Sequence, residues 1–275
     1  MMNTRRMLVA LALAVMAFAA QRPALAQSRE ESKLLSATRV LEELRAQRDQ
    51  AIPERLLQRA YGVAVIPSVR KVAFVLGGRG GRGVLTVRDS RGRFSNPVFI
   101  TLAGGSVGWQ IGAQETDVVL VFTTRRGIEG IADGKLTLGA GASAAAGPVG
   151  RQAEVAAGVN AEVFSYSRAR GLFAGVALDG TSISIDNKGN GYFYNKRGVL
   201  TSDILSGAVG TSSENARRFL AAVAASTGES ASAPTAAPAA PAAPAGTPGP
   251  APAAPAAGGV KTFPMEDPAP GKEPR

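Results

Sequence analysis

Cysteine and histidine are both absent from the 275 residues of this chain. Without them the common zinc sites cannot be built, and nucleophilic catalysis by Ser–His–Asp or Cys–His groups is excluded. Hydrolysis by paired carboxylates stays chemically possible, but the 21 acidic residues are scattered and outnumbered by 31 basic ones. We therefore expect a protein that is not an enzyme and that uses no metal and no cofactor. A carboxylate-only enzyme, the alternative, would draw its acids from Asp117, Glu115, Glu162 and Asp179.

Long hydrophobic runs are also scarce, and the most prominent one is Met7–Ala20. Arg5 and Arg6 precede this run, and Ala24-Leu25-Ala26 follows it as an A-x-A-like cleavage site. A membrane-spanning helix needs about 20 apolar residues, so this shorter run predicts a cleaved signal peptide over residues 1–26. We expect export to a bacterial periplasm, where the protein is soluble or peripherally membrane-associated. The sequence leaves Sec and twin-arginine export both open.

Negative charge is in deficit, because the formal net charge at pH 7 is +10. Three arginines and no acid lie before residue 27, so the remainder carries +7. The segment after residue 230 is neutral, which leaves the excess on the region between the signal and the tail. Basic domains favour anionic partners such as nucleic acid, phospholipid head groups or acidic polymers, and export argues against nucleic acid. The alternative is that the charge only keeps the protein soluble.

Residues 28–60 have helical periodicity, with a break at Ile52-Pro53 and a second short helix through Leu56, Leu57 and Ala60. Their apolar side chains recur at spacings of three and four residues, which predicts an amphipathic helix. Such a helix either lies on a membrane surface or packs its stripe on the domain's own sheet. The stripe consists of Leu34, Ala37, Val40, Leu41 and Leu44.

From Tyr61 onward, short β-type runs alternate with Gly, Pro and Arg. Such spacing favours an antiparallel meander or barrel, so we predict an α+β domain over residues 27–228, with a Gly-rich antiparallel sheet and a barrel-like core. A short helix over Arg125–Asp133 ends at Gly134, and the capping box Thr211–Glu214 opens a C-terminal helix that closes the domain. The expected strands are 62–67, 72–76, 84–87, 97–102, 107–113, 117–123, 135–138, 171–178 and 182–186, together with part of the alternating stretch 153–166.

The composition becomes rich in Ala and Pro after Gly228. This segment has few bulky apolar residues to bury, so residues 229–275 are predicted to be a disordered tail. The tail is either a spacer or a free end.

Two glycine motifs imitate functional signatures. Gly78–Gly83 matches G-x-G-x-x-G and Gly104–Gly108 matches G-x-S-x-G. The first requires a helix after it and the second requires a strand-to-helix turn and a histidine base, whereas a strand is expected after each. Nucleotide binding and a Ser106 nucleophile are therefore both rejected, and Gly78–Gly83 is predicted to be a hairpin that displays Arg79 and Arg82.

The remaining signal is electrostatic, because arginines crowd residues 70–93 and recur next to Tyr166. Guanidinium groups pair well with phosphate oxygens, and Trp and Tyr suit the head-group level of a membrane. The alternative is that these arginines are solvated hairpin residues and that the aromatic residues belong to the core. The candidate head-group ligands are Lys71, Arg79, Arg82, Arg168 and Arg170, and the candidate membrane-interface residues are Trp109, Tyr166 and Phe173.

Five blocks in order give the chain a family resemblance: GVAVIP (62–67), GGRGG (77–81), GGSVGWQIGAQ (104–114), GPVGR (147–151) and YSRARGLFAGVALDG (166–180). Their order and spacing resemble the SYLF domain over about residues 30–225. The resemblance implies a lipid-binding domain without catalytic activity. It also implies anionic phospholipid ligands and, in yeast relatives, an association with actin.

An exported chain is not expected to meet actin or phosphoinositides. The resulting hypothesis is non-enzymatic binding of anionic phospholipid or a membrane surface through a basic face. The alternative is a structural or protein-interaction module of the envelope, with another envelope protein as partner and the Ala/Pro-rich tail as spacer.

Overall fold

The computed structural model describes residues 27–47, 52–89, 91–132, 134–148, 161–169 and 172–228, without the side chains of 72–76, 106–113 and 132. The predicted signal peptide and tail lie outside these residues, as does Arg170. The helices within the described ranges include none that is both long and apolar enough to cross a membrane.

The N-terminal helix covers residues 27–46 and is part of the core. Its predicted apolar stripe, from Leu34 to Leu44, is at most 4% exposed at every position. Burial of five such side chains stabilises the docked helix, so the stripe packs on the domain itself. The short helix α2 (Glu54–Gln58) follows Pro53, as predicted, and contacts the last helix of the domain.

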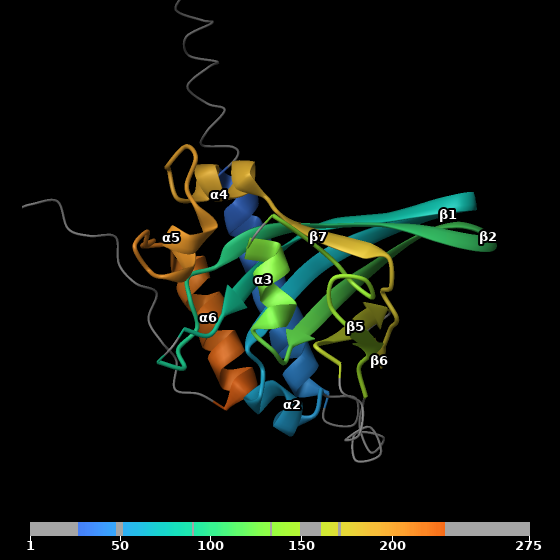
Figure 1. Cartoon of the computed structure of the whole chain (residues 1–275), viewed down its shortest axis with the longest axis horizontal. Coiled ribbons are helices and arrows are strands. Elements are labelled where there is room, and N and C mark those ends of the chain that lie inside the picture. Colours follow the sequence, from blue (N-terminus) through green and yellow to red (C-terminus); the bar gives the residue numbers. More distant parts are fainter. Residues whose placement is uncertain are drawn as a thin grey trace, which may run out of the picture. The chain divides into compact units, whose positions relative to one another are not determined.

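Two long strands dominate the sheet (Figure 1). β1 (Gly62–Val87) pairs along its length with β2 (Val98–Phe122) in one antiparallel ladder. The prediction of six short strands here was wrong, because the glycines and prolines mark bends within strands instead of turns between them. The register shifts between Ile66 and Val69 and again between Ala73 and Val75, and such bulges bend a ribbon.

The bend brings the two ends of β1 together. The backbone N–H of Arg88 donates to the carbonyl of Tyr61 over 2.8 Å. A Cβ placed on Gly83 would lie 2.7 Å from the Cα of Ile66, so only glycine permits this contact between the two halves. The predicted hairpin at 78–83 is therefore wrong, since these residues lie inside β1.

The other strands complete a curled half-barrel in the order β3-β7-β2-β5-β4, with β1 also on β2 and β6 also on β5. Every pair is antiparallel except β4 with β5. The predicted α+β class and barrel-like antiparallel core are thereby confirmed. These strands are β3 (Lys135–Thr137), β4 (Ala144–Ala146), β5 (Val163–Ala169), β6 (Leu172–Gly175) and β7 (Thr181–Ile185).

The described residues form four further helices beside the sheet. α3 (Arg126–Ala132) ends before Gly134, whose φ of +122° favours glycine, as predicted. α4 (Asn187–Phe193) and α5 (Thr201–Leu205) were not predicted. Two glycines inside α4 and the shortness of α5 hide their periodicity. α6 (Glu214–Thr227) is the predicted C-terminal helix.

The capping box assigned to α6 was wrong by two residues. Ser213, not Thr211, is the N-cap, and its hydroxyl accepts a hydrogen bond from the N–H of Ala216 over 3.1 Å. Glu214 is then the first helical residue and pairs with Arg217 and Arg218 one turn later.

Candidate functional site

The predicted head-group cations do not share one surface. Lys71 is exposed on β1, where it pairs in register with Gln114 of β2. Arg79 and Arg82 are three residues apart in an unbroken register, so their side chains point to opposite faces of the strand. Arg79 is half-buried, and its Nε has no hydrogen-bond partner among the described residues.

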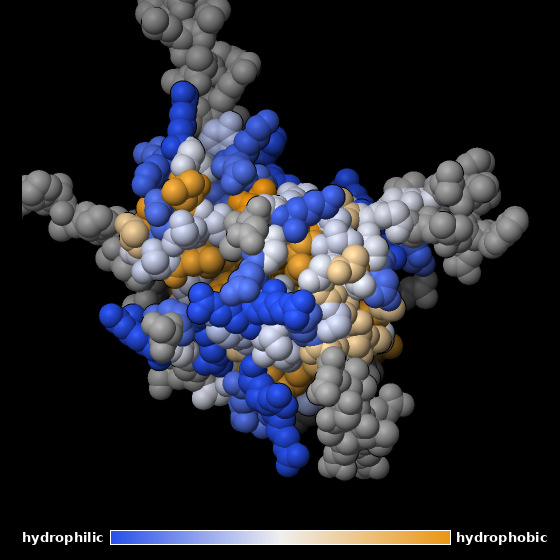
Figure 2. All heavy atoms as spheres, in the orientation of Figure 1, coloured by the Kyte–Doolittle hydropathy of each residue, from blue (hydrophilic) through white to orange (hydrophobic). Residues whose placement is uncertain are grey.

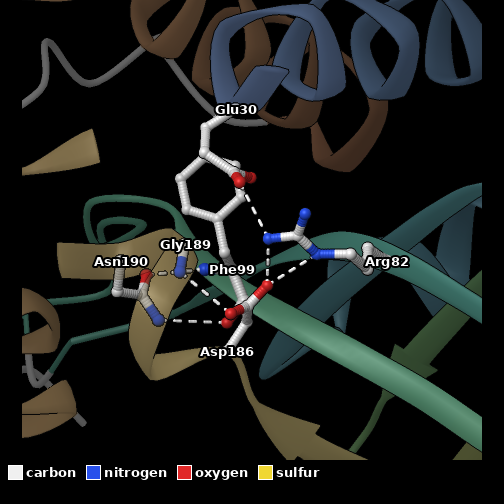
Figure 3. Close-up of polar contacts among 6 residues, drawn as sticks. All are labelled: Glu30, Arg82, Phe99, Asp186, Gly189 and Asn190. Carbon is white, nitrogen blue, oxygen red and sulfur yellow. Dashed lines mark hydrogen bonds and ion pairs between the residues drawn. The ribbon is translucent and has the colours of Figure 1, made fainter. Parts of the chain in front are cut away.

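Arg82 lies between two carboxylates (Figure 3). Its Nη2 donates to Glu30 of the N-terminal helix over 2.8 Å, and its Nε donates to Asp186 over 2.7 Å. Asp186 is also the N-cap of α4, where it accepts from the N–H of Gly189 over 2.9 Å. One guanidinium thus joins the N-terminal helix, β1 and the start of α4.

A side-chain amide fixes α4 to β2 by making the two backbone hydrogen bonds that a neighbouring strand would make. The Oδ1 of Asn190 accepts from the N–H of Phe99 over 2.8 Å, and its Nδ2 donates to the carbonyl of Phe99 over 3.1 Å. Asn190 is 1% exposed, so these bonds satisfy groups that would be costly to bury unpaired.

Burial shifts two ionisable groups of the N-terminal helix. It raises the pKa of Glu30, which is 3% exposed, although neighbouring Arg82 acts in the opposite direction. Burial also lowers the pKa of Lys33, and the nearby positive charge of Arg82 adds to this effect. The domain therefore holds both groups in places that disfavour their charged forms.

Arg168 on β5 makes a second arrangement of the same kind. It pairs with Glu43 near the end of the N-terminal helix and with Asp117 of β2, whose Oδ2 is 3.1 Å from Nε. Its guanidinium carbon also lies 5.9 Å from the centroid of the Phe173 ring. Arg82 and Arg168 are thus occupied by carboxylates of the domain in this conformation.

A third carboxylate of the same helix is bound without a cation. Glu31 accepts hydrogen bonds from the hydroxyl of Ser213 and the amide of Asn215, each over 2.9 Å. Sequence reasoning missed these acids and Asp186. Glu30 did carry a signal, because it lies one helical turn before Leu34 and so belongs to the apolar stripe.

Of the three aromatic residues predicted to lie at a membrane interface, the two whose side chains are described are buried. Tyr166 is fully buried, its hydroxyl donates to the carbonyl of Pro148, and burial raises its pKa. Phe173 is 3% exposed. The side chain of Trp109 lies outside the described side chains. The structure therefore offers neither Tyr166 nor Phe173 to a membrane surface in this conformation.

Few large apolar side chains are exposed in the part of the chain whose side chains are described. Figure 2 shows hydrophobic areas on the visible face separated by hydrophilic residues. The large exposed ones among the described residues are Leu35, Leu172, Tyr192 and Leu200. They come from the N-terminal helix, from β6, and from α4 with the segment after it, so they give no reason to expect deep insertion into a bilayer.

Positive charge does gather where the N-terminal helix meets β1. Arg70 and Lys71 are exposed there, and Lys33 is close enough to Arg70 for that charge to lower the lysine pKa. Two acids lie at this place: Glu30, whose charge acts on Lys33, and Glu115, 3.8 Å from Arg70 in an exposed pair. Lys71 is the next residue after Arg70 in an unbroken register, so its side chain points to the other face of the ribbon. The three cations therefore lie around the root of the ribbon and not on one face of it, and we call Lys33, Arg70 and Lys71 the basic cluster.

A polar cavity of about 320 Å³ lies beside the basic cluster, between the N-terminal helix and the first bulge of the sheet. Glu115 and Asp117 both line it, but Glu115 pairs with Arg70 and Asp117 with Arg168, so each acid has a cationic partner. The full lining is Ser36, Arg39, Val40, Pro67, Ser68, Glu115, Thr116, Asp117 and Arg168.

The described residues form no group of three or more potential metal ligands from His, Cys, Asp and Glu. Gly104 and Gly105 lie within β2 and not at a strand-to-helix turn, so the backbone there lacks the form of a nucleophile elbow.

The sheet and its helices define an α+β domain with a half-barrel sheet, and sequence comparison gives its family. The profile described as "Ysc84: Las17-binding protein actin regulator" matches residues 103–226. These residues run from near the start of β2 almost to the end of α6 and include Arg168 and Asp186. The predicted resemblance to the SYLF family is thereby confirmed for this part of the chain.

Similar proteins come from yeast and vertebrates. Two from Saccharomyces cerevisiae are each 40% identical: LAS seventeen-binding protein 3 over 151 residues and Protein YSC84 over 167 residues. The human SH3 domain-containing YSC84-like protein 1 is 39% identical over 149 residues. These alignments cover 53%, 58% and 53% of this chain but only 33%, 35% and 43% of the relatives, so the chain spans less than half of their length. One of these names describes a binding protein, and none of the three describes an enzyme.

Proposed function

We propose that this protein is exported and binds anionic phospholipid surfaces without catalysis, through cations at the root of the β1–β2 ribbon. The observation that carries the proposal is the basic cluster. Arg70 and Lys71 are exposed, while Arg82 and Arg168 are engaged with carboxylates. Lys71 stays a head-group candidate, and Lys33 and Arg70 replace the two engaged arginines.

The physical case is electrostatic. A basic residue close to an anionic membrane contributes about 1 kcal/mol, and the contribution falls off within a Debye length. Few large apolar side chains are exposed among those that the structure describes, which supports surface attachment over insertion. The net charge of +7 after residue 26 supplies long-range attraction to the same surface.

Vesicle co-sedimentation of an Arg70→Gln/Lys71→Gln variant tests the proposal. Loss of two cations should weaken binding to phosphatidylglycerol-containing vesicles about 30-fold, which corresponds to about 2 kcal/mol. The matched control, Arg125→Gln/Lys135→Gln, removes the same charge from the start of α3 and from β3, outside the basic cluster. Equal losses in the two variants would show that only net charge matters, and would contradict binding through the root of the ribbon.

A protein-interaction module is the second candidate function. It is favoured by the name of one yeast relative, LAS seventeen-binding protein 3, and by the description of the matching family as Las17-binding. Affinity capture from envelope extracts, with and without residues 230–275, separates the two. Lipid binding by the domain should survive removal of the tail, whereas a partner recognised through the tail would be lost.

A further inference from the structure

The cavity beside the basic cluster has mixed charge, and its composition restricts what can bind there. Arg39 and Arg168 contribute two positive charges, and Glu115 and Asp117 contribute two negative ones. A simple anion would face two carboxylates, and a simple cation would face two guanidinium groups. An apolar ligand would desolvate all four charges without replacing their hydrogen bonds. The complementary ligand therefore carries both charges.

The positive side of the cavity combines an exposed guanidinium with an engaged one. Arg39 is exposed on the N-terminal helix and has no ion-pair partner among the described residues. Arg168 pairs with Glu43 and Asp117, and its side chain is 21% exposed, so part of it still reaches solvent. Guanidinium groups prefer planar or tetrahedral oxyanions, to which they donate two hydrogen bonds.

The negative side of the cavity lies next to a residue with a strained backbone conformation. Ser68 has a φ of +56°, unusual for a residue with a side chain, and lies in the bulge between Ile66 and Val69. Its N–H donates to Asp117 over 3.0 Å, which fixes that carboxylate at the cavity wall. Strained residues and bulges are frequent where a fold forms a binding site.

The geometry points to a binding site for a small zwitterion, a phosphate ester that also carries a primary ammonium group, as in phosphoethanolamine. Its phosphate would meet Arg39 and the exposed part of Arg168, and its ammonium group would donate to Glu115 and Asp117. The choice of phosphate over another oxyanion rests on the proposed function, which places the domain at a phospholipid surface. The shared chemistry occurs in a lipid head group and in a soluble ester, and the test separates these sources.

Titration calorimetry of the full protein with O-phosphoethanolamine tests the site, with inorganic phosphate and ethanolamine as single-charge probes. We expect binding of the zwitterion that is at least about tenfold tighter than that of either fragment. Arg39→Gln and Glu115→Gln should each weaken it about tenfold or more. The matched control is Arg45→Gln, which removes an exposed arginine from the same helix outside the cavity and should bind like the wild type.

Three results would overturn the site: no heat with O-phosphoethanolamine, equal affinity for inorganic phosphate, or equal effects of Arg39→Gln and Arg45→Gln. Vesicles identify the source, because phosphatidylethanolamine offers the ammonium donors that phosphatidylcholine lacks. A preference for phosphatidylethanolamine vesicles would show that the ligand is a lipid head group. Binding of O-phosphoethanolamine without such a preference would show that the ligand is a soluble ester. Sedimentation with phosphatidylglycerol vesicles reports the basic cluster separately, so failure of either proposal is recognisable.

Discussion

Arginine has two different roles in this domain. Arg82 and Arg168 each bridge a carboxylate of the N-terminal helix and a carboxylate of the sheet region, so their charge is neutralised locally. Arg39 and Arg70 are exposed; among the described residues Arg39 has no carboxylate partner, and Arg70 has only an exposed one at 3.8 Å. The sequence shows that arginine is abundant, but pairing depends on residues more than 100 positions apart, as in Arg82 with Asp186. Local sequence patterns contain no information on such pairs.

Replacement of Arg82 by Gln should reveal its structural role. Loss of one partner of a buried ion pair costs about 3–5 kcal/mol. The side chain of Arg82 is 43% exposed, so solvent screening reduces the expected loss to about 2 kcal/mol. Urea unfolding at pH 7 measures it. Arg82→Gln/Glu30→Gln should recover most of the stability, and a double variant as weak as the single one would contradict a charge-based explanation.

The pH dependence of Arg82→Gln has a definite sign. Burial raises the pKa of Glu30 above its ordinary 4.5, and loss of Arg82 raises it further. Between 4.5 and the raised pKa the folded state binds more protons than the unfolded state, so stability falls as pH rises through that window. The deficit of the variant relative to the wild type should therefore be larger at pH 8 than at pH 5. A constant deficit would show that Glu30 does not titrate in this range.

Lys33 links stability to binding. Burial lowers its pKa, so the fold disfavours its charged form, yet the proposed function uses that charge. Lys33→Gln should raise the free energy of unfolding by less than about 1 kcal/mol and weaken binding to anionic vesicles. Thermal unfolding and sedimentation of one preparation measure both, with Arg45→Gln as the control for general loss of charge. A variant that is less stable than the wild type would contradict the inference that burial of Lys33 destabilises the fold.

At the scale of elements, the helices with clear apolar periodicity were predictable and the long ribbon was not. The N-terminal helix, α3 and α6 begin and end close to the expected residues because their stripes and caps are local signals. β1 and β2 were divided into six strands because glycine and proline usually mark turns. Here the register shifts let a continuous ladder bend, and this becomes visible only when the two halves of β1 meet.

Glycine substitutions test that bend directly. Gly83→Ala places a methyl group 2.7 Å from the Cα of Ile66, where backbone atoms would have to move. We expect a loss of about 3 kcal/mol in unfolding free energy. Gly105→Ala is the matched control in the partner strand, because nothing lies within 4 Å of its added Cβ, and it should change stability by less than about 0.5 kcal/mol. Similar losses in both variants would refute close packing of the two halves.

At the scale of the whole molecule, the family was recognisable from the order of five glycine-containing blocks. The location of a binding site was not. Two of the five predicted head-group cations are engaged with carboxylates, and two predicted interface aromatics are buried. Lys71 stays exposed, and residues without a distinctive motif, such as Arg39 and Ser68, line the cavity. The excess of positive charge can be read from the sequence. Which of the basic residues remain available for binding depends on which acids the fold places beside them.

The most direct test of the central claim is co-sedimentation of the wild-type protein with vesicles of phosphatidylcholine containing increasing fractions of phosphatidylglycerol, at several NaCl concentrations. Attachment through exposed cations predicts weak binding to pure phosphatidylcholine, a steep rise with the anionic fraction, and a loss of binding as salt shortens the Debye length. Equal binding to neutral and anionic vesicles, or binding that is indifferent to salt, would contradict the account.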